Sequence, residues 1–459
     1  MGVASKSLAK RNMNQEVIGK CSDYTHDGQG IVKIDGLPIF VEGLFIGEEA
    51  KIEILFNKSD YAIGKIIKLL NLSPDRITPR CPVATACGGC SFQALAYPAQ
   101  LAFKKRKVSE ALRKIGGIDA EVDEVVGMEN PYFYRNKTQM PVGYDKQNRL
   151  VSGFYRRFTH TIVPIEKCYI EDERSSSILA NIKLAMKENK IMAYNEDTRV
   201  GVIRHVLIKT SQAFKDIMVV LVTNADSFPG RNNLVKSIKE KCPEVTTIVQ
   251  NINLRDTNVI LGEKENVLFG KGFIKDELHG LAFNISSKSF YQVNPIQASK
   301  LYDLAMQKAG LTGDEIVIDA YCGVGTISLI ASKFAKEVIG VEIVKEAVED
   351  AIRNARLNNI TNTKFFTSDA SQFIENLIQQ GTNIDVVFVD PPRKGLEDSF
   401  VKSLLKLKPQ KIVYVSCEPS TLARDLKLLK ESYNVQSVSP VDMFPMTYHV
   451  ETITLLSLK

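Results

Sequence analysis

A regular alternation of apolar runs and helical segments in the C-terminal part most constrains how this chain folds. The apolar runs lie at 315–320, 337–342, 363–367, 384–390 and 411–416, and segments of helical character, such as 344–358, separate them. Two further predicted strands, near 433–440 and 450–457, end the chain. Strands and helices in alternation indicate βαβ units and a mostly parallel sheet. We therefore predict an α/β, Rossmann-like domain over residues 286–459.

Two polar motifs stand where predicted strands of that sheet end. Asp390-Pro-Pro-Arg-Lys-Gly395 follows the run 384–389, and Ser416-Cys417-Glu-Pro419 follows the run 412–415. Both runs are typical of parallel strands that are buried on both faces. In open α/β sheets, ligands and chemistry collect just beyond the carboxyl ends of the strands. An acid at one strand end and a cysteine at another are therefore placed for function rather than for packing alone.

The first predicted strand of the sheet runs into a glycine-containing turn, Asp319-Ala-Tyr-Cys-Gly-Val-Gly-Thr326. Glycines there let the backbone approach a ligand at a helix N-terminus. Glu342 ends the second strand, where it can hydrogen-bond two ribose hydroxyls, and Asp369 follows the third, where it can meet an adenine amino group. This geometry suits NAD and S-adenosylmethionine (SAM) equally. Because the region has neither a P-loop nor an arginine-rich phosphate clamp, a cofactor without phosphates, SAM, is the better match.

The chain before residue 286 divides into two further parts. Residues 12–70 contain short β signals broken by glycine-containing turns, which predicts a small antiparallel barrel over residues 1–72. Such barrels often bind oligonucleotides. Residues 73–285 are mixed and strand-rich, and we predict a central domain there. Its helix near 97–115, rich in Lys and Arg, is expected to pack on the C-terminal domain.

The composition is that of an ordinary soluble protein. Of the 459 residues, 44% are hydrophobic and 24% are charged, as in typical globular domains. No apolar run is long enough to span a membrane, and the basic N-terminus Met1–Arg11 lacks the apolar core of a signal peptide. We therefore expect a cytoplasmic location and no membrane partner. The formal net charge of +6 is compatible with a polyanionic partner.

Four of the eight cysteines form a candidate metal site. Cys81-x5-Cys87-x2-Cys90 places three thiols close together, and Cys168 is a fourth. In a cytosolic chain of this length, cysteines are more often metal-binding, catalytic or inert than paired in disulfides. Four thiolates can hold zinc or an iron–sulfur cluster. Zinc ribbons usually pair two Cys-x2-Cys units, so the three-plus-one arrangement favours a [4Fe-4S] cluster over zinc or free thiols.

Taken together, these motifs resemble those of the RNA uracil-5-methyltransferases that use SAM. The resemblance rests on Asp319–Thr326, Gly340-Val-Glu342, Asp390–Gly395, Ser416–Pro419, Ser289-Phe-Tyr-Gln-Val-Asn-Pro295 and the terminal Asp442-Met-Phe-Pro-Met-Thr-Tyr-His-Val-Glu451. It extends over essentially the whole chain, with an N-terminal barrel similar to a TRAM domain. Met446 departs from the family pattern, which often has His at this position. Several members of the family carry a [4Fe-4S] cluster on the cysteine spacing found here, which implies a cluster on Cys81, Cys87, Cys90 and Cys168.

The chemistry of the family assigns roles to individual residues. By resemblance, Cys417 is the nucleophile that adds to carbon 6 of uracil and makes carbon 5 reactive towards a methyl group. By resemblance, Glu451 is the base that removes the proton from carbon 5, so that the thiolate can leave. Residue 451 begins the last predicted strand, which can lie beside the strand that ends at 416. The SAM contacts carry over to Gln292, Tyr321, Glu342 and Asp390, with Asp369 as an addition, and Phe290 is a candidate to stack on the uracil.

The resemblance implies RNA as the partner, with 23S ribosomal RNA as the leading substrate. We expect the enzyme to be a monomer. Bacterial tRNA enzymes of the family generally lack both the barrel and the cysteine cluster, but archaeal relatives with a cluster keep a tRNA T-loop uridine as the alternative. The target carbon is inaccessible in a stacked helix, so the base must flip out or lie in a loop. Two segments that interleave aromatic and cationic residues, Tyr132-Phe-Tyr-Arg-Asn-Lys137 and Phe154-Tyr-Arg-Arg-Phe158, are candidate RNA contacts.

Three other classes of protein fit the sequence less well. A radical SAM enzyme needs Cys-x3-Cys-x2-Cys, whereas the spacing here is Cys-x5-Cys-x2-Cys. An NAD-dependent oxidoreductase would carry the dinucleotide fingerprint GxGxxG after the first strand. A non-catalytic RNA-binding module would not need Cys417 and Glu451 together.

Overall fold

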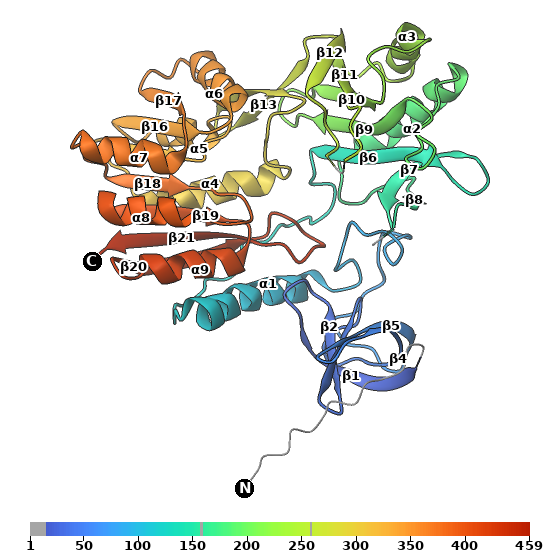
Figure 1. Ribbon diagram of the computed structural model, residues 1–459, viewed down its shortest axis with the longest axis horizontal. Helices are drawn as coiled ribbons and strands as arrows, with labels where there is room; N and C mark the ends of the chain where they lie inside the picture. The colour runs from blue at the N-terminus through green and yellow to red at the C-terminus, as the bar shows by residue number, and fades with distance from the viewer. Residues whose placement is uncertain (1–14, 157–158, 258) are drawn as a thin grey trace.

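The computed structural model describes residues 15–156, 159–257 and 259–459. The basic N-terminus Met1–Arg11, and Arg157 and Phe158 of the second aromatic–basic segment, lie outside these ranges. Figure 1 shows the N-terminal barrel at the bottom, the central sheet at the upper right and the C-terminal sheet at the left. The arrangement confirms the predicted fold class: a Rossmann-like domain, a small barrel and a mixed central part.

The C-terminal sheet has the strand order β17-β16-β15-β18-β19-β21-β20. Its strands are β15 (Ile316–Ala320), β16 (Glu337–Glu342), β17 (Thr363–Thr367), β18 (Val386–Val389), β19 (Lys411–Ser416), β20 (Tyr433–Val441) and β21 (Glu451–Leu458). Its helices are α4 (Pro295–Ala309), α5 (Thr326–Ala331), α6 (Lys345–Leu357), α7 (Ala370–Gln379), α8 (Asp398–Leu407) and α9 (Pro419–Leu429). Neighbours from β17 to β19 pair in parallel, whereas β21 runs antiparallel to both β19 and β20.

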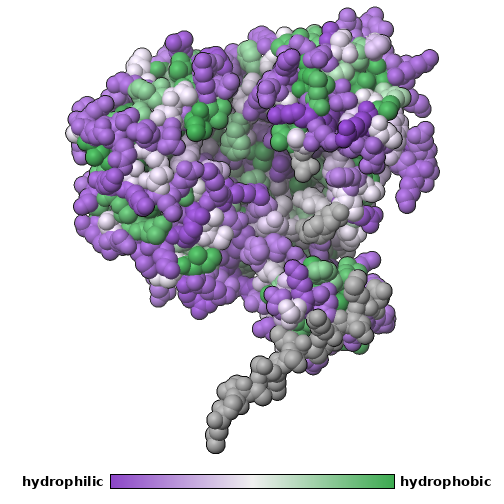
Figure 2. Space-filling model, in the orientation of Figure 1, coloured by the Kyte–Doolittle hydropathy of each residue, from purple (hydrophilic) through white to green (hydrophobic). Residues whose placement is uncertain are grey.

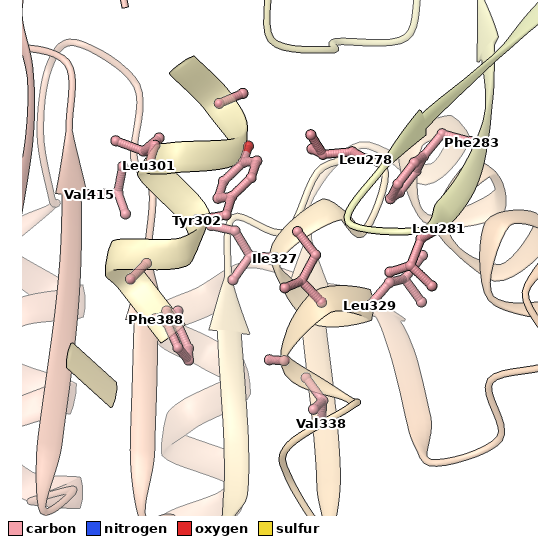
Figure 3. Packing of buried hydrophobic residues seen from close by; sticks show 14 of the residues in the cluster. Leu278, Leu281, Phe283, Leu301, Tyr302, Ile327, Leu329, Val338, Phe388 and Val415 are labelled. Carbon is pink, nitrogen blue, oxygen red and sulfur yellow. The ribbon is translucent and has the colours of Figure 1, made fainter. Parts of the chain in front are cut away.

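Helices cover both faces of this sheet, which explains why its central parallel strands, such as β18 and β19, are continuous apolar runs. Along β19, Ile412 and Tyr414 pack in the cluster formed with α7, α8 and α9, whereas Val413 and Val415 pack on the side of α4 and α5. Figure 3 shows the second side, where Leu301 of α4 lies beside Val415. Alternate residues of one strand therefore face two separate cores, and a polar residue in the middle of the strand would be buried on either side.

Helix α4 begins with the N-terminal cap that its sequence predicts. The side chain of Asn294 accepts a hydrogen bond from the backbone N–H of Gln297 at 3.2 Å, and Pro295 occupies the first helical position. The Asn side chain at the N-cap gives a partner to a backbone N–H that would otherwise have none, and Pro at the first helical position has no N–H that needs a partner. This cap confirms the predicted start of the helix that precedes β15.

The N-terminal barrel is closed, with the strand order β1-β2-β3-β5-β4. Its strands are β1 (Glu16–Tyr24), β2 (Gly30–Ile34), β3 (Leu37–Val41), β4 (Glu49–Asn57) and β5 (Ala62–Leu69), and aliphatic side chains such as Val32, Ile39 and Ile52 fill the interior. The predicted barrel is present, but β3 and β5 pair in parallel, so it is not antiparallel throughout. A closed ring with an odd number of strands cannot alternate direction everywhere, because the last strand must meet the first.

The central sheet has the strand order β12-β11-β10-β9-β6-β7-β8. Its strands are β6 (Lys137–Tyr144), β7 (Leu150–Tyr155), β8 (Ile162–Pro164), β9 (Ile203–Thr210), β10 (Ile217–Thr223), β11 (Thr247–Ile252) and β12 (Lys264–Phe269), with helices α2 (Glu173–Glu188) and α3 (Arg231–Lys241). The hairpin of β13 (Phe273–Leu278) and β14 (Leu281–Ser286) then leads towards α4. The side chain of Asn358, beyond α6, exchanges hydrogen bonds with the backbone of Ala282, which fixes this hairpin to the C-terminal sheet.

Helix α1 (Tyr97–Ala111) lies against the C-terminal part of the protein. It continues as a π-helical turn (Leu112–Gly116) and contacts α9 and β20. Lys104 of α1 and Asp442, the residue after β20, form an ion pair with both side chains fully buried. Figure 1 shows α1 directly below α9. A helix that precedes the central sheet in the chain is therefore part of the packing around the C-terminal sheet.

In the ranges that the structure describes, no helix is both long and apolar enough to cross a membrane. Figure 2 shows a mainly hydrophilic face that is hollowed between the part built on the C-terminal sheet and the part built on the central sheet.

Candidate active site

A pocket of about 650 Å³ opens at the carboxyl ends of the parallel strands of the C-terminal sheet. This is the edge at which open α/β sheets bind their ligands. The residues marked by the sequence line it together: Phe290, Gln292, Tyr321, Glu342, Asp369, Asp390, Cys417 and Glu451. They come from separate parts of the chain, so the strand order of the sheet is what gathers them.

Cys417 and Glu451 lie where the ends of two neighbouring antiparallel strands meet. Cys417 follows β19 directly and Glu451 begins β21, and the register places Ser416 opposite Thr452. This pairing confirms that the last strand lies beside the one that ends at 416. Glu451 is only 4% exposed, and burial is the main cause that raises the pKa of its carboxyl to about 8. Such a carboxyl can gain or lose a proton near neutral pH, as a general base requires.

Acidic groups surround the half-buried thiol of Cys417. The pKa of this thiol is raised to about 12, mainly by burial and further by the carboxylates of Glu451 and Asp390, while the cation of Arg393 lowers it. Burial also raises the pKa of Asp390 to about 7 and that of Asp319 to about 7. Each raised pKa means that the negatively charged form of that group is disfavoured in the pocket. A cationic ligand in this pocket would therefore lower all of these pKa values, which makes the site suited to a positively charged cofactor.

The turn after β15 brings the backbone close to the pocket. Tyr321, Gly323 and Gly325 all have positive φ, at 69°, 53° and 83°. A Cβ at Gly325 would lie 3.0 Å from Ala351 and 3.1 Å from Phe365, so this position needs glycine for space as well as for its backbone conformation. The tight turn leaves the Tyr321 ring at the pocket wall.

Backbone groups orient the two acids at the cofactor end of the pocket. The carboxylate of Glu342 accepts hydrogen bonds from the backbone N–H groups of Gly323 at 3.2 Å and Val344 at 2.9 Å. Asp369 caps α7 and accepts a hydrogen bond from the backbone N–H of Gln372 at 3.0 Å. Both carboxylates are thus held in one orientation before any ligand binds, while each retains lone pairs for hydroxyl or amino groups.

Gln292 and Phe290 enter the pocket from the loop between β14 and α4. Asn136, from the start of the central sheet, donates a side-chain hydrogen bond to the carbonyl of Gln292 at 3.1 Å. The ammonium group of Lys209 on β9 donates to the carbonyl of Ser289 at 2.9 Å. The central sheet therefore holds this loop in place. Phe290 is 67% exposed, so its ring offers a flat apolar surface at the mouth of the pocket.

The pocket also contains residues to which sequence analysis assigned no role. Arg393 lines it beside Asp390, and its place in the same six-residue motif was the available signal. His449 lines it as well, with its ring centroid 6.0 Å from that of Phe444, and burial lowers its imidazole pKa to about 4. Tyr302 reaches the pocket from α4 without any motif that could have marked it.

The first aromatic–basic segment is divided between the core and the surface. Tyr134 is fully buried, and its hydroxyl donates to the carbonyl of Pro445 at 3.1 Å. The rings of Tyr132 and Phe133 instead pack against the guanidinium of Arg80, whose carbon lies 4.9 and 5.3 Å from their centroids. At least Tyr134 therefore links the central and C-terminal parts rather than offering a free surface to RNA.

The four marked cysteines line a second cavity, of about 330 Å³, in the central part of the protein. Its border includes Cys81, Cys87, Cys90, Cys168, Arg135 and Glu171. Burial raises the pKa of Cys90 to about 12, and the side chain of Gln93 donates to its sulfur at 3.5 Å. Among the described residues, no group of His, Cys, Asp or Glu is arranged as the ligand set of a metal ion. The cavity thus gathers four thiols that are not in ligand geometry.

Comparisons with known proteins agree with the pocket. A model of the tRNA (uracil-5-)-methyltransferase family matches residues 96–459. An uncharacterized RNA methyltransferase of Clostridium acetobutylicum is 47% identical over 451 residues, 97% of each chain, and one of Bacillus cereus is 46% identical over 437 residues, 95% of each. The crystal structure of Pyrococcus abyssi tRNA (uracil-54, C5)-methyltransferase in complex with S-adenosyl-L-homocysteine matches with a TM-score of 0.77 at 29% identity, covering 96% of this chain and 99% of that one.

The fold and the pocket define a SAM-dependent methyltransferase. The chain belongs to the tRNA (uracil-5-)-methyltransferase family, whose members are SAM-dependent RNA uracil-5-methyltransferases. This confirms the family, the enzyme class and SAM as the cofactor that the sequence predicted. The family match begins at residue 96, so it includes α1 but neither the barrel nor Cys81, Cys87 and Cys90.

Proposed function

We propose that this enzyme methylates carbon 5 of a uridine in 23S ribosomal RNA through a covalent adduct between Cys417 and carbon 6. The observation that carries the mechanism is one pocket in which a half-buried thiol faces a buried carboxyl whose pKa is raised to about 8. Addition to a ring carbon and later elimination need a nucleophile and a base at the same substrate. Cys417 and Glu451 supply that pair from adjacent strands.

Residues of the chain account for each step on the uracil ring. Cys417 reacts as the thiolate: its sulfur bonds to carbon 6, and the electron pair of the carbon 5–carbon 6 double bond moves into the ring as an enolate, so carbon 5 becomes nucleophilic. SAM, when bound, supplies the methyl group that carbon 5 takes. Glu451 then accepts the proton from carbon 5, the double bond re-forms, and Cys417 leaves as a thiolate. One methyl group thus replaces one proton, which ends on Glu451.

The cofactor end of the pocket is proposed to bind SAM through a defined set of residues. Glu342 would accept hydrogen bonds from the ribose hydroxyls and Asp369 from the adenine amino group, while Tyr321 packs on the adenine. Asp390 and Gln292 would contact the amino-acid part. The acid-rich surroundings support this assignment, because SAM carries a positively charged sulfonium.

Replacing Glu342 with alanine is expected to weaken SAM binding by about 1.5–3 kcal/mol, or about 10- to 100-fold, because two charge-assisted hydrogen bonds are lost. Isothermal titration with SAM measures the effect. Glu346→Ala, on the exposed start of α6, is the matched control and should bind as the wild type does. Equal affinities for Glu342→Ala and the control would contradict the ribose assignment.

The rate of turnover is expected to rise with pH through about 8, because Glu451 accepts a proton only when it is ionised. Arg393→Gln should shift this profile to higher pH, since the cation lowers the pKa of both Glu451 and Cys417. Turnover measured across neutral and alkaline pH tests this, with Lys402→Gln on the exposed side of α8 as the control. If the pH dependence of turnover is the same in Arg393→Gln as in the wild type, the cation of Arg393 does not act on the pKa values of Glu451 and Cys417.

We propose that the four-cysteine cavity holds a [4Fe-4S] cluster. The donor set supports this, because four thiols in one cavity with apolar walls, such as Phe154 and Ile165, suit a cubane better than a single hard cation. Small adjustments of the side chains would be needed to bring the sulfurs into ligand geometry. The methylation chemistry transfers no net electrons, so the role of the cluster would be structural or in RNA binding.

Anaerobically purified protein is expected to contain about four iron and four sulfide per chain. Cys90→Ser should lose most of this iron, because one thiolate ligand is removed. Cys242→Ser is the control, since Cys242 is buried at the end of α3, outside the cavity lining. Iron and acid-labile sulfide assays provide the measurement. One equivalent of zinc and no iron would contradict the cluster and favour a structural zinc site.

Ribosomal RNA is the substrate that we favour over tRNA. Bacterial tRNA enzymes of the family generally lack the barrel and the cysteine set, whereas this chain has both and its relatives of 46–47% identity are bacterial. A tRNA T-loop uridine is the second candidate. It is favoured by the match to the Pyrococcus tRNA enzyme over 96% of this chain, a span too long to omit the barrel.

Incubation of the protein with methyl-labelled SAM and either unmodified 23S rRNA or tRNA distinguishes the two substrates. Nucleoside mass spectrometry should find 5-methyluridine in the 23S rRNA and none in the tRNA. Label in tRNA alone would keep the chemistry and overturn the substrate.

We further propose that the units 1–72 and 73–285 select the RNA while 286–459 carries out the chemistry, with the enzyme acting as a monomer in the cytoplasm.

A further inference from the structure

One face of α1 carries a row of polar side chains that no step of the reaction uses. Tyr97, Gln100, Lys104 and Lys107 recur at intervals of three and four residues, the spacing of a single helical face. Gln100 and Lys104 are fully buried. A buried lysine is rare unless it is paired, because removing its charge from water is costly. The row therefore has a specific partner.

That partner is the segment 442–450, between β20 and β21. The hydroxyl of Tyr97 donates to one carboxylate oxygen of Asp442 at 2.8 Å, and Lys104 forms an ion pair with the other. The ammonium group of Lys104 also donates to the backbone carbonyl of Phe444 at 3.1 Å. The start of the segment is thus held by two side chains of one helix.

Gln100 and Lys107 hold the rest of the segment. The backbone N–H of Met446 donates to the side-chain oxygen of Gln100 at 3.0 Å. Lys107 donates to the carbonyl of Tyr448 at 3.3 Å and lies 5.1 Å from the centroid of its ring. Met446 has a φ of 67°, a conformation that non-glycine residues rarely adopt. Gln100 of α1, together with the backbone N–H groups of Ser91 and Phe92, which donate to the carbonyl of Met446 at 2.9 and 3.0 Å, therefore maintains this conformation against the local preference of the backbone.

The segment matters because it ends at the pocket. Phe444, His449 and Glu451 all line the pocket, and Glu451 is the residue that follows the segment. We propose that the polar row of α1 is a positioning device, which holds the segment 442–450 and thereby sets Glu451 against the target base. The proposal rests on the proposed role of Glu451 as the base. The family match is consistent with it, since it begins at residue 96, directly before α1.

Two variants that weaken the row and one matched control test the proposal in the full-length protein. Gln100→Leu removes a backbone contact without changing the charge. Lys104→Met combined with Asp442→Asn removes the buried ion pair from both sides, so that no unpaired charge is left buried. Lys105→Met is the control, because Lys105 is the next residue of α1 and pairs with the exposed Glu124 instead.

In both test variants we expect turnover to fall about 10²-fold, because a small misplacement of a reacting group can cost that much. The KM for SAM should change by less than about twofold, since the cofactor residues lie on other loops. A protein–RNA adduct that carries the methyl label and survives denaturation should accumulate, because proton removal slows more than methyl transfer. Lys105→Met should behave as the wild type does.

Unchanged turnover in a folded Gln100→Leu protein would overturn the proposal, as would an equal loss in Lys105→Met. A rise in the KM for SAM without any adduct would also overturn it, because that pattern belongs to general loosening of the fold. Thermal melting of each variant establishes that it is folded before its kinetics are compared.

The imidazole of His449 provides a readout that does not depend on the chemistry of Glu451. Burial holds its pKa at about 4, and Gln100→Leu should raise that pKa towards the ordinary value of about 6.5 as the segment loosens. Nuclear magnetic resonance titration, with His449→Gln to assign the signal, measures this shift. A raised pKa of His449 with no adduct in Glu451→Gln would reject Glu451 as the base and keep the positioning role. An unchanged pKa in folded Gln100→Leu would reject the positioning role itself.

Discussion

Replacement of Cys417 by alanine is expected to lower methyl transfer to RNA by at least about 10⁴-fold, because removing the nucleophile of a covalent mechanism removes the pathway rather than one contact. Without addition of sulfur to carbon 6, carbon 5 of uracil remains a poor nucleophile. Affinity for SAM should stay close to that of the wild type, since the proposed cofactor contacts come from other loops of the pocket. Single-turnover incorporation of labelled methyl groups measures the first effect, and calorimetric titration of SAM measures the second.

Cys242→Ala is the control for loss of a thiol as such. Cys242 is also buried, but it lies at the end of α3 in the central part of the protein, outside the pocket lining. Its variant should retain the activity of the wild type within about threefold, as expected for a small cavity away from the site. Methylation at a wild-type rate by Cys417→Ala would rule out the covalent adduct and require a different route to an activated carbon 5.

Glu451→Gln is expected to lower turnover by about 10²–10⁴-fold and to trap the enzyme after methyl transfer. Glutamine has nearly the same shape as glutamate but cannot accept the proton from carbon 5. The double bond then does not re-form, and Cys417 stays bonded to carbon 6. Denaturing electrophoresis with methyl-labelled SAM should therefore show a protein–RNA adduct that carries the label.

The double variant Cys417→Ala/Glu451→Gln is the control, and it should form no adduct. Three outcomes separate the possible roles of Glu451. An adduct with the methyl label supports proton removal as its role. An adduct without the label would place Glu451 before methyl transfer, and full turnover would exclude it as the base.

The order of the C-terminal elements was predictable because strongly patterned strands and helices alternate there. The run 411–416 became β19 (Lys411–Ser416) with no change, and the predicted helix 344–358 became α6 (Lys345–Leu357). Parallel strands that face two cores must be apolar on both sides, so their boundaries are clear in the sequence. The positions of Cys417 and Asp390 beyond strand ends followed from the same pattern.

Contacts between distant segments were not predictable in the same way. The sequence marked α1 as a basic helix, but nothing local showed that Lys104 would be buried against Asp442. Tyr134 has the neighbours of an RNA-binding aromatic, yet the fold places it in the core. The parallel pairing of β3 and β5 follows from closure of the barrel, which is a property of the whole ring.

The sequence by itself determined the Rossmann-like fold, the family and the set of candidate residues. Motif spacing and strand periodicity are local properties, so they can be recognised in the sequence without the folded structure. Only the tertiary structure decided how these residues act on one another. The pKa of Glu451 near 8, the opposing charge of Arg393 and the hold of α1 on the segment 442–450 depend on burial and on distances across the fold. Electrostatic effects of this kind arise from neighbours that are far apart in the chain, and so they appear only when the chain is folded.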